Sequence, residues 1–96
     1  MNGGFFAIRY GPSAGTTARM GMAVSRKVSK RAVVRNRIKR QVRESFRHQR
    51  ASLPFVDMLV IARSTAATAD NSALRLELDQ LWARLKVSSA RLERQP

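Results

Sequence analysis

The chain contains no cysteine and only one histidine, His48. Without cysteine it forms no disulfide and performs no thiolate chemistry, and it lacks the usual Cys and His ligands of a zinc site. No apolar run approaches the roughly 20 residues that a membrane-spanning helix needs. The opening residues, MNGGFFAIRY, lack both the basic segment and the long apolar segment of a signal peptide. Together these absences predict a cytoplasmic chain with no membrane partner.

Acidic residues are also scarce, with six Asp and Glu against nineteen Lys and Arg, which gives a formal net charge of +13. The acids are scattered along the chain and predict neither a catalytic constellation nor a metal site. They are Glu44, Asp57, Asp70, Glu77, Asp79 and Glu93. So large a positive excess favours a polyanionic partner. Nucleic acid is the first candidate, an acidic membrane surface the second and an acidic protein the third.

Positive charge is concentrated in residues 25–50, which hold eleven of the nineteen Lys and Arg and a single acid, Glu44. Residues 32–49 have helical periodicity, with one apolar face formed by Val34, Ile38, Val42 and Phe46. The remaining faces are mostly cationic, with Arg35, Lys39, Arg43 and Arg47 in one row and Asn36, Arg40 and Arg50 further round. Like charges one turn apart destabilise a helix, so this surface predicts a bound polyanion.

The other hydrophobic patterns predict three strands and a second helix. Residues 5–10 and 18–25 are typical of strands joined as an antiparallel hairpin, and residues 55–62 of an interior strand covered on both faces. A final helix has a core-facing stripe, and Asp70, Asn71 and Ser72 are candidates to cap it. The stripe consists of Leu74, Leu78, Leu81, Trp82 and Leu85. The order β-β-α-β-α predicts an α+β fold, a two-layer α/β sandwich with a small mixed sheet.

A single domain is expected over residues 1–87, followed by a flexible tail over residues 88–96. Ser29 is a possible but poorly placed cap for the basic helix. In the second strand, Gly21, Ala23 and Ser25 alternate with larger side chains. Such a small-residue face leaves room either for a closely packed helix or for a ligand that lies against the sheet.

One motif in the basic helix is specific: Arg35-Asn36-Arg37-Ile38-Lys39-Arg40, followed by Arg43-Glu44 and Phe46-Arg47. It resembles the signature of the bacterial ribonuclease P protein component. Residues 21–27 (GMAVSRK), 57–63 (DMLVIAR) and 81–85 (LWARL) are similar, in the same order, to that family's flanking strand, late strand and last helix. The resemblance covers about residues 5–86.

The resemblance implies an RNA-binding subunit of an endoribonuclease whose RNA subunit removes the 5′ leader of precursor tRNA. In that family the protein binds the catalytic RNA and the leader, which raises substrate affinity and lowers the magnesium requirement. The expected partners are therefore ribonuclease P RNA and precursor tRNA, with no obligate protein partner. No cofactor is expected on the protein alone, and Mg²⁺ is expected with the RNA subunit. The family fold also has a left-handed βαβ crossover, against the usual hand.

The resemblance also assigns roles to residues, none of them catalytic or metal-binding. The signature residues expected to contact the catalytic RNA are Arg35, Asn36, Arg37, Lys39, Arg40 and Arg43. The basic connector and the later part of the helix extend this surface through Arg26, Lys27, Lys30, Arg31 and Arg47. The leader cleft is expected on the sheet, at Phe6, Ile8, Met22 and Val24 or on the opposite face. Ile8 stands where many relatives have an aromatic residue.

Three residues of the basic helix have further expected roles. Glu44, one turn from Arg40 and close to Arg47, is expected to hold their guanidinium groups in place. Arg37 is expected to brace the helix as well as to touch RNA. Asn36 is expected to make either a specific hydrogen bond to RNA or a local bond that shapes the helix start.

The start of the chain departs from the family pattern, in which a basic segment and a helix precede the first strand. Either the start of the sequence is assigned too late or this is a shortened form. In both cases one wall of the leader cleft is missing and the small-residue face of the second strand is exposed. Two other classes of function are weighed against the resemblance: a general RNA-binding module of similar fold, and a self-sufficient nuclease, which needs clustered carboxylates or histidines.

Overall fold

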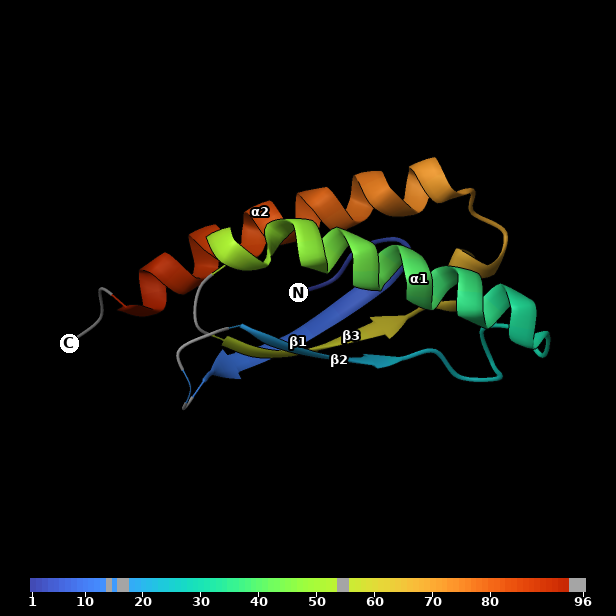
Figure 1. Ribbon diagram of the computed structural model, residues 1–96, viewed down its shortest axis with the longest axis horizontal. Coiled ribbons are helices and arrows are strands. Elements are labelled where there is room, and N and C mark those ends of the chain that lie inside the picture. The colour runs from blue at the N-terminus through green and yellow to red at the C-terminus, as the bar shows by residue number, and fades with distance from the viewer. Residues whose placement is uncertain (14, 16–17, 54–55, 94–96) are drawn as a thin grey trace.

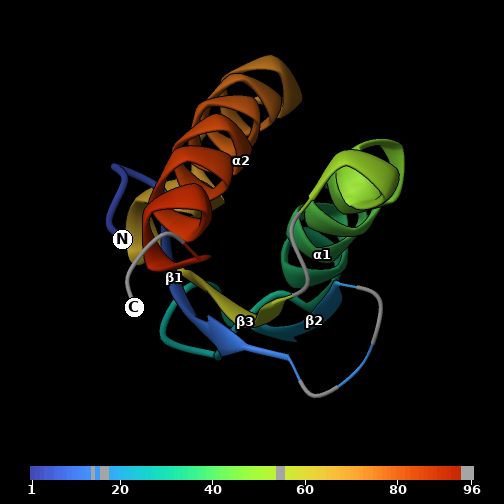
Figure 2. The same cartoon turned by 90° about the vertical axis from the view of Figure 1, so that its left-hand side faces the viewer.

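Both helices lie on the same side of a three-stranded sheet, so the chain forms two layers (Figures 1 and 2). The computed structural model describes residues 1–13, 15, 18–53 and 56–93. The strands are β1 (Phe6–Pro12), β2 (Arg19–Ala23) and β3 (Val56–Ala62), and the helices are α1 (Ala32–Gln49) and α2 (Asn71–Glu93). Two short 3₁₀ helices, η1 (Arg50–Ser52) and η2 (Ser64–Ala67), flank β3. The predicted order β-β-α-β-α and the α+β class are confirmed.

The sheet order is β1-β3-β2, so the predicted hairpin between the first two strands is wrong. β3 pairs antiparallel with β1 and parallel with β2. As the most apolar strand, β3 has the most to gain from the central position, where both of its edges are paired and covered. Seen as in Figure 2, β2 and β3 run away from the viewer, and the chain passes counterclockwise from β2 up through α1 and down to β3. This is the left-handed crossover that the family resemblance implies.

The core lies between the helices and one face of the sheet. α1 contributes Ile38 and Val42, which are fully buried as predicted, while Val34 and Phe46 pack at the margin. The predicted stripe of α2 is confirmed, since all its members are buried: Leu74, Leu78, Leu81, Trp82 and Leu85. A buried hydrogen bond in this core was not predicted. Trp82 Nε1 donates a 2.7 Å hydrogen bond to Ser45 Oγ, which satisfies both groups away from water.

The opposite face of the sheet is not covered by either helix (Figure 1). Side chains of β3 alternate, with Val56, Met58, Val60 and Ala62 buried against the helices and Leu59 38% exposed on the other side. The expectation that β3 is covered on both faces is therefore wrong for the described residues. The same holds for the close-packed helix considered over Gly21 and Ala23, because α1 and α2 both pack on the other face.

Strand register arranges this open sheet face as three short rows across β1, β3 and β2. One row is apolar and contains Ala7, Ile61 and Ala23; the middle row contains Arg9, Leu59 and Gly21; the last contains Gly11, Asp57 and Arg19. In the last row, the Arg19 guanidinium holds the Asp57 carboxylate through two 2.9 Å hydrogen bonds. The face thus grades from apolar at one end to charged at the other.

At the helix ends, one predicted cap is confirmed and two other expectations are corrected. Asp70 caps α2, with its Oδ1 accepting a 2.8 Å hydrogen bond from the Ala73 backbone N–H. Ser29 does not cap α1, because its hydroxyl instead accepts a bond from the backbone N–H of Arg31, which precedes the first helical residue. α2 continues through Glu93, so residues 88–93 belong to the helix instead of the predicted tail. Residues 94–96 of that tail lie outside the described residues.

The first residues fold back along β1, an arrangement that sequence reasoning missed. Ile8 N–H donates to the Met1 carbonyl at 2.8 Å, and Gly3 N–H donates to the Phe6 carbonyl at 2.7 Å. The Glu77 carboxylate of α2 then accepts backbone N–H bonds from Gly4 at 2.6 Å and from Phe5 and Phe6 at 2.9 Å. A side chain at Gly3 would place its Cβ 2.6 Å from Glu77 Cδ, so this clamp requires glycine there.

We predict that Ser45→Ala destabilises the fold by roughly 1–3 kcal/mol, because it leaves the buried indole N–H of Trp82 without its acceptor. Urea denaturation followed by Trp82 fluorescence measures this difference. Ser72→Ala, an exposed serine in the first turn of α2, is the matched control and should be close to neutral. Equal midpoints for the two variants would contradict the prediction.

We also predict that the stabilising effect of the Arg19–Asp57 pair disappears in acid. Hydrogen bonding to the Arg19 guanidinium lowers the pKa of the Asp57 carboxyl. A carboxyl whose pKa is lower in the folded state stabilises the fold above its unfolded-state pKa of about 3.9, and the effect is lost as pH falls through the folded-state value. Asp57→Asn should therefore melt below the wild type near neutral pH, and the difference should close in acid. Circular dichroism melts over a pH series measure this, and a difference that persists unchanged in acid would contradict it.

Candidate nucleic-acid interface

The solvent-facing ridge of α1, opposite buried Ile38 and Val42, carries cations. We call this the basic ridge, and its exposed members are Asn36, Arg40, Arg43 and Arg47, with Val33 at its start. Their spacing of three and four residues keeps them on one side of the helix. Because the core fixes the rotation of α1 about its axis, these side chains are held toward solvent. Lys39 and Arg35, predicted in the same row as Arg43, are half-buried on one flank instead.

That flank meets the connector between β2 and α1. Arg26, Lys27, Lys30 and Arg35 line a groove of about 450 Å³ there, with no acid among its lining residues. Arg35 Nη1 donates a 2.8 Å hydrogen bond to the Ser29 carbonyl, so the connector is tied to the helix. Arg31 is exposed at the start of α1. The structure therefore brings the predicted connector cations next to the helix cations.

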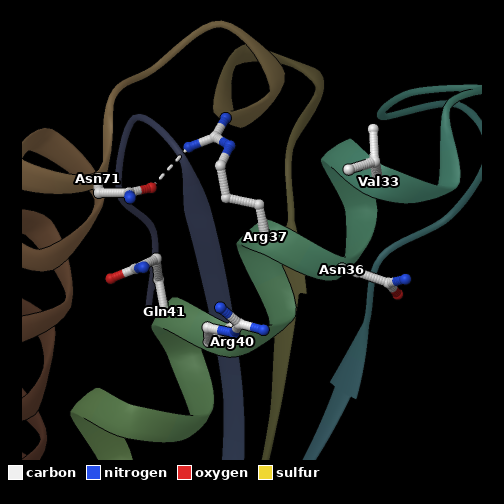
Figure 3. A pocket seen from close by; sticks show the side chains of 6 residues that line it. All are labelled: Val33, Asn36, Arg37, Arg40, Gln41 and Asn71. Carbon is white, nitrogen blue, oxygen red and sulfur yellow. Dashed lines mark hydrogen bonds between the residues drawn. The ribbon is translucent and has the colours of Figure 1, made fainter.

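The other flank of α1 faces α2. Arg37 Nη1 donates to Asn71 Oδ1 at 2.9 Å, and its Nη2 donates to the Ala67 carbonyl at 3.3 Å. Arg37 thus braces α1 against the start of α2, as expected of it. A second groove, of about 490 Å³, opens beside this contact (Figure 3). It is lined by Val33, Asn36, Arg37, Arg40, Gln41 and Asn71. Gln41 and Asn71 were not predicted as site residues, because nothing in the sequence places α2 beside the signature.

Glu44, the only acid in α1, pairs across the helices. Its Oε2 lies 3.7 Å from Arg75 Nη1 of α2. The expected bracing of Arg40 and Arg47 by Glu44 is not found among the described residues, where neither ion pair involves Arg40, Arg43 or Arg47. Glu44 still lines a third groove, of about 280 Å³, with those three arginines. One nearby carboxylate against three arginines compensates the positive field of the basic ridge only in part.

The predicted leader-cleft residues point into the core. Phe6 is 0% and Ile8 1% exposed beneath the helices, so the assignment of these two side chains to an open cleft is wrong. Met22 and Val24 are partly buried against the same core. Of the two faces left open by the sequence, only the opposite one is accessible, and it carries Ala7, Arg9, Gly21 and Leu59. The choice required the strand register and the position of the helices, which alternation alone does not give.

Four of the six acids have structural partners among the described residues. Asp57 pairs with Arg19, Asp70 caps α2, Glu77 binds the N–H groups of residues 4–6, and Glu44 pairs with Arg75. His48 is exposed near the end of α1. Across the described part of the chain, no three His, Asp or Glu side chains gather in a way that could hold a metal ion. No helix in that part is long and apolar enough to cross a membrane. The grooves around α1 are instead rich in hydrogen-bond donors and positive charge.

Known proteins show the same combination of sequence and fold. A sequence-family model described as Ribonuclease P matches residues 1–86. The chain is 45% identical to the ribonuclease P protein component of Azoarcus over 88% of this chain and 71% of the relative. It is 46% identical to that of Thioalkalivibrio sulfidiphilus over 79% of this chain and 63% of the relative. For several relatives, then, the chain spans less than two thirds of their length.

Solved structures agree with the sequence comparison. The RNase P protein of Staphylococcus aureus superposes with a TM-score of 0.81 at 27% identity, over 90% of this chain and 81% of that one. That of Thermotoga maritima superposes with a TM-score of 0.77 at 29% identity, over 88% and 80%. Membership of one family accounts for the signature on α1, the mixed sheet and its left-handed crossover. The chain belongs to the ribonuclease P protein family.

Proposed function

We propose that this chain is the RNA-binding subunit of a ribonuclease P, in which it binds the catalytic RNA through α1 and its connector. The observation that carries the proposal is the basic ridge, whose arginines have no carboxylate partner among the described residues. Arginine's planar fork suits phosphate oxygens, and a row of such groups gains most from a strand of closely spaced phosphates. Release of counterions from that strand then supplies much of the binding free energy.

In the proposed complex, the RNA subunit cleaves the 5′ leader of precursor tRNA in the cytoplasm. Four of the six acids already serve as a helix cap, a backbone clamp or an ion-pair partner, which supports an assisting role. We propose that Mg²⁺ is held with the RNA subunit and that the protein lowers the concentration required by neutralising phosphates. A self-sufficient nuclease is disfavoured, because the described residues do not cluster carboxylates or histidines.

We further propose that the leader lies on the open sheet face. Its middle row offers an exposed cation, Arg9, beside the exposed apolar surface of Leu59 and the flat backbone of Gly21. A phosphate can pair with Arg9 while the attached ribose or base contacts Leu59. None of the described residues in the three rows of this face carries an aromatic ring, so their contact with the leader is expected to depend weakly on leader sequence.

We predict that removing basic-ridge cations reduces the salt dependence of RNA binding. Arg40→Ala and Arg43→Ala should each weaken binding to ribonuclease P RNA and lower the log–log salt slope by about one unit per lost phosphate contact. Filter binding over a series of potassium concentrations measures both quantities. Arg84→Ala is the matched control, because Arg84 is exposed on α2 and, among the described residues, donates a hydrogen bond only to the Asn2 carbonyl. Slopes that stay unchanged in both ridge variants would refute the ridge as the RNA surface.

We predict that the protein stimulates precursor-tRNA cleavage by a bacterial ribonuclease P RNA at low magnesium. Two substrates separate the two proposed surfaces: one with a long 5′ leader and one with a single leader nucleotide. Arg9→Ala should reduce stimulation only for the long leader, whereas Arg40→Ala should reduce it for both. No stimulation by the wild type would favour a general RNA-binding module. An equal effect of Arg9→Ala on both substrates would remove the leader from the open sheet face.

A further inference from the structure

The groove between α1 and the start of α2 contains polar groups that the family signature does not include. We call it the amide groove, because two of its lining residues, Gln41 and Asn71, carry side-chain amides (Figure 3). α1 supplies one wall through Val33, Asn36 and Arg40, and Asn71, the first residue of α2, supplies the other. It lies beside the basic ridge, so an RNA strand on the ridge passes its mouth.

The orientation of the Asn71 amide is set by Arg37. A guanidinium group only donates hydrogen bonds, so the atom that Asn71 presents to Arg37 Nη1 at 2.9 Å must be its carbonyl oxygen. The NH₂ group of Asn71 is thereby turned away from Arg37, and within the described residues it donates no hydrogen bond. Gln41 follows the same pattern, since its Oε1 accepts a long, 3.4 Å hydrogen bond from Arg75 Nη1. In both amides the oxygen accepts a hydrogen bond from an arginine, and the NH₂ group donates none among the described residues.

The amide groove therefore presents donors to a ligand. Among the described residues, the NH₂ groups of Asn71 and Gln41 and the guanidinium of Arg40 donate no hydrogen bond, and no carboxylate lines the groove. A donor-only site with a net positive charge selects an anion with several acceptor oxygens. Val33, 64% exposed at the mouth, adds an apolar surface next to these donors. A phosphate with an attached ribose satisfies both requirements.

We propose that the amide groove seats one phosphate of the bound RNA, with Asn71 and Arg40 as direct contacts and the ribose against Val33. In this arrangement Arg37 is a positioning residue. Its two terminal nitrogens hold Asn71 and the Ala67 carbonyl, which fixes the far wall and the direction of the Asn71 donor. The inference rests on the proposed function, because it specifies which atoms of this chain meet RNA.

Substitution of Asn71 separates its two roles. Asn71→Asp keeps an acceptor for Arg37 and places a negative charge in the first turn of a helix, so the melting temperature should be equal to or above that of the wild type. It replaces the groove donor with a carboxylate, so affinity for ribonuclease P RNA should fall by about tenfold or more. Ser72→Asp, which adds the same charge on the neighbouring exposed residue, is the matched control and should change affinity by less than about threefold.

Asn71→Ala tests the loss of the donor without a change in charge. Affinity should fall by roughly three- to tenfold, the size expected for one hydrogen bond, with the salt slope unchanged because no cation is lost. Arg37→Lys keeps its charge but lacks the planar fork that holds two acceptors at once. If Arg37 acts through Asn71, adding Asn71→Ala to Arg37→Lys should weaken binding little further.

The outcomes are distinguishable. Equal affinities for Asn71→Asp and Ser72→Asp, or additive effects of Arg37→Lys and Asn71→Ala, would overturn the phosphate seat and leave the wider basic ridge intact. Failure of the wild type to bind ribonuclease P RNA with a salt-dependent affinity would instead overturn the proposed function itself. Circular dichroism spectra and melts of every variant, measured in the same buffer, verify that each affinity compares folded proteins.

Discussion

Burial of one face of α1 against the sheet is the constraint on which the rest of this structure depends. Ile38 and Val42 enter the core with the leucines and Trp82 of α2, and this fixes the rotation of α1 about its axis. Once that rotation is set, Arg40, Arg43 and Arg47 must face solvent. The apolar contacts offset the mutual repulsion of these cations, and a bound polyanion can replace that repulsion with a net attraction. The residues that stabilise the fold therefore also determine that these arginines face solvent.

Polar contacts between the two helices determine where several of their polar side chains lie. α1 and α2 run in the same direction (Figure 1), and contacts link them along their length: Arg37 with Asn71, Glu44 with Arg75, Ser45 with Trp82 and Gln49 with Lys86. Parallel helix dipoles gain nothing from each other, so directional bonds are the natural way to hold this arrangement. One of these contacts pairs Glu44 with Arg75 of α2, although Glu44 also lines a groove with the arginines of the basic ridge.

The two proposed RNA surfaces lie on different layers of the molecule. The basic ridge belongs to the helical layer, and the open sheet face lies on the other side of the sheet (Figure 2). α1 sits over the β2 side, and the connector with Arg26 and Lys27 leads from β2 to α1, so positive charge continues from one layer toward the other. A protein built in this way can hold a catalytic RNA and a substrate strand without placing them on the same surface.

Periodicity and charge in the sequence determined the bounds of α1, its buried face, the stripe of α2 and the cationic character of the proposed RNA surface. These are local properties, set by side chains three and four residues apart. Only the tertiary structure decided that β3 separates β1 from β2, that Phe6 and Ile8 belong to the core, and that Glu44 pairs with Arg75. It also decided that Asn71 faces Arg37 across a groove. The reason is physical. Alternation in a strand separates two faces but does not indicate which face is buried, and the apolar stripe of a helix does not indicate which element it packs against. Pairing across 34 residues, as between Arg37 and Asn71, follows from how the layers pack.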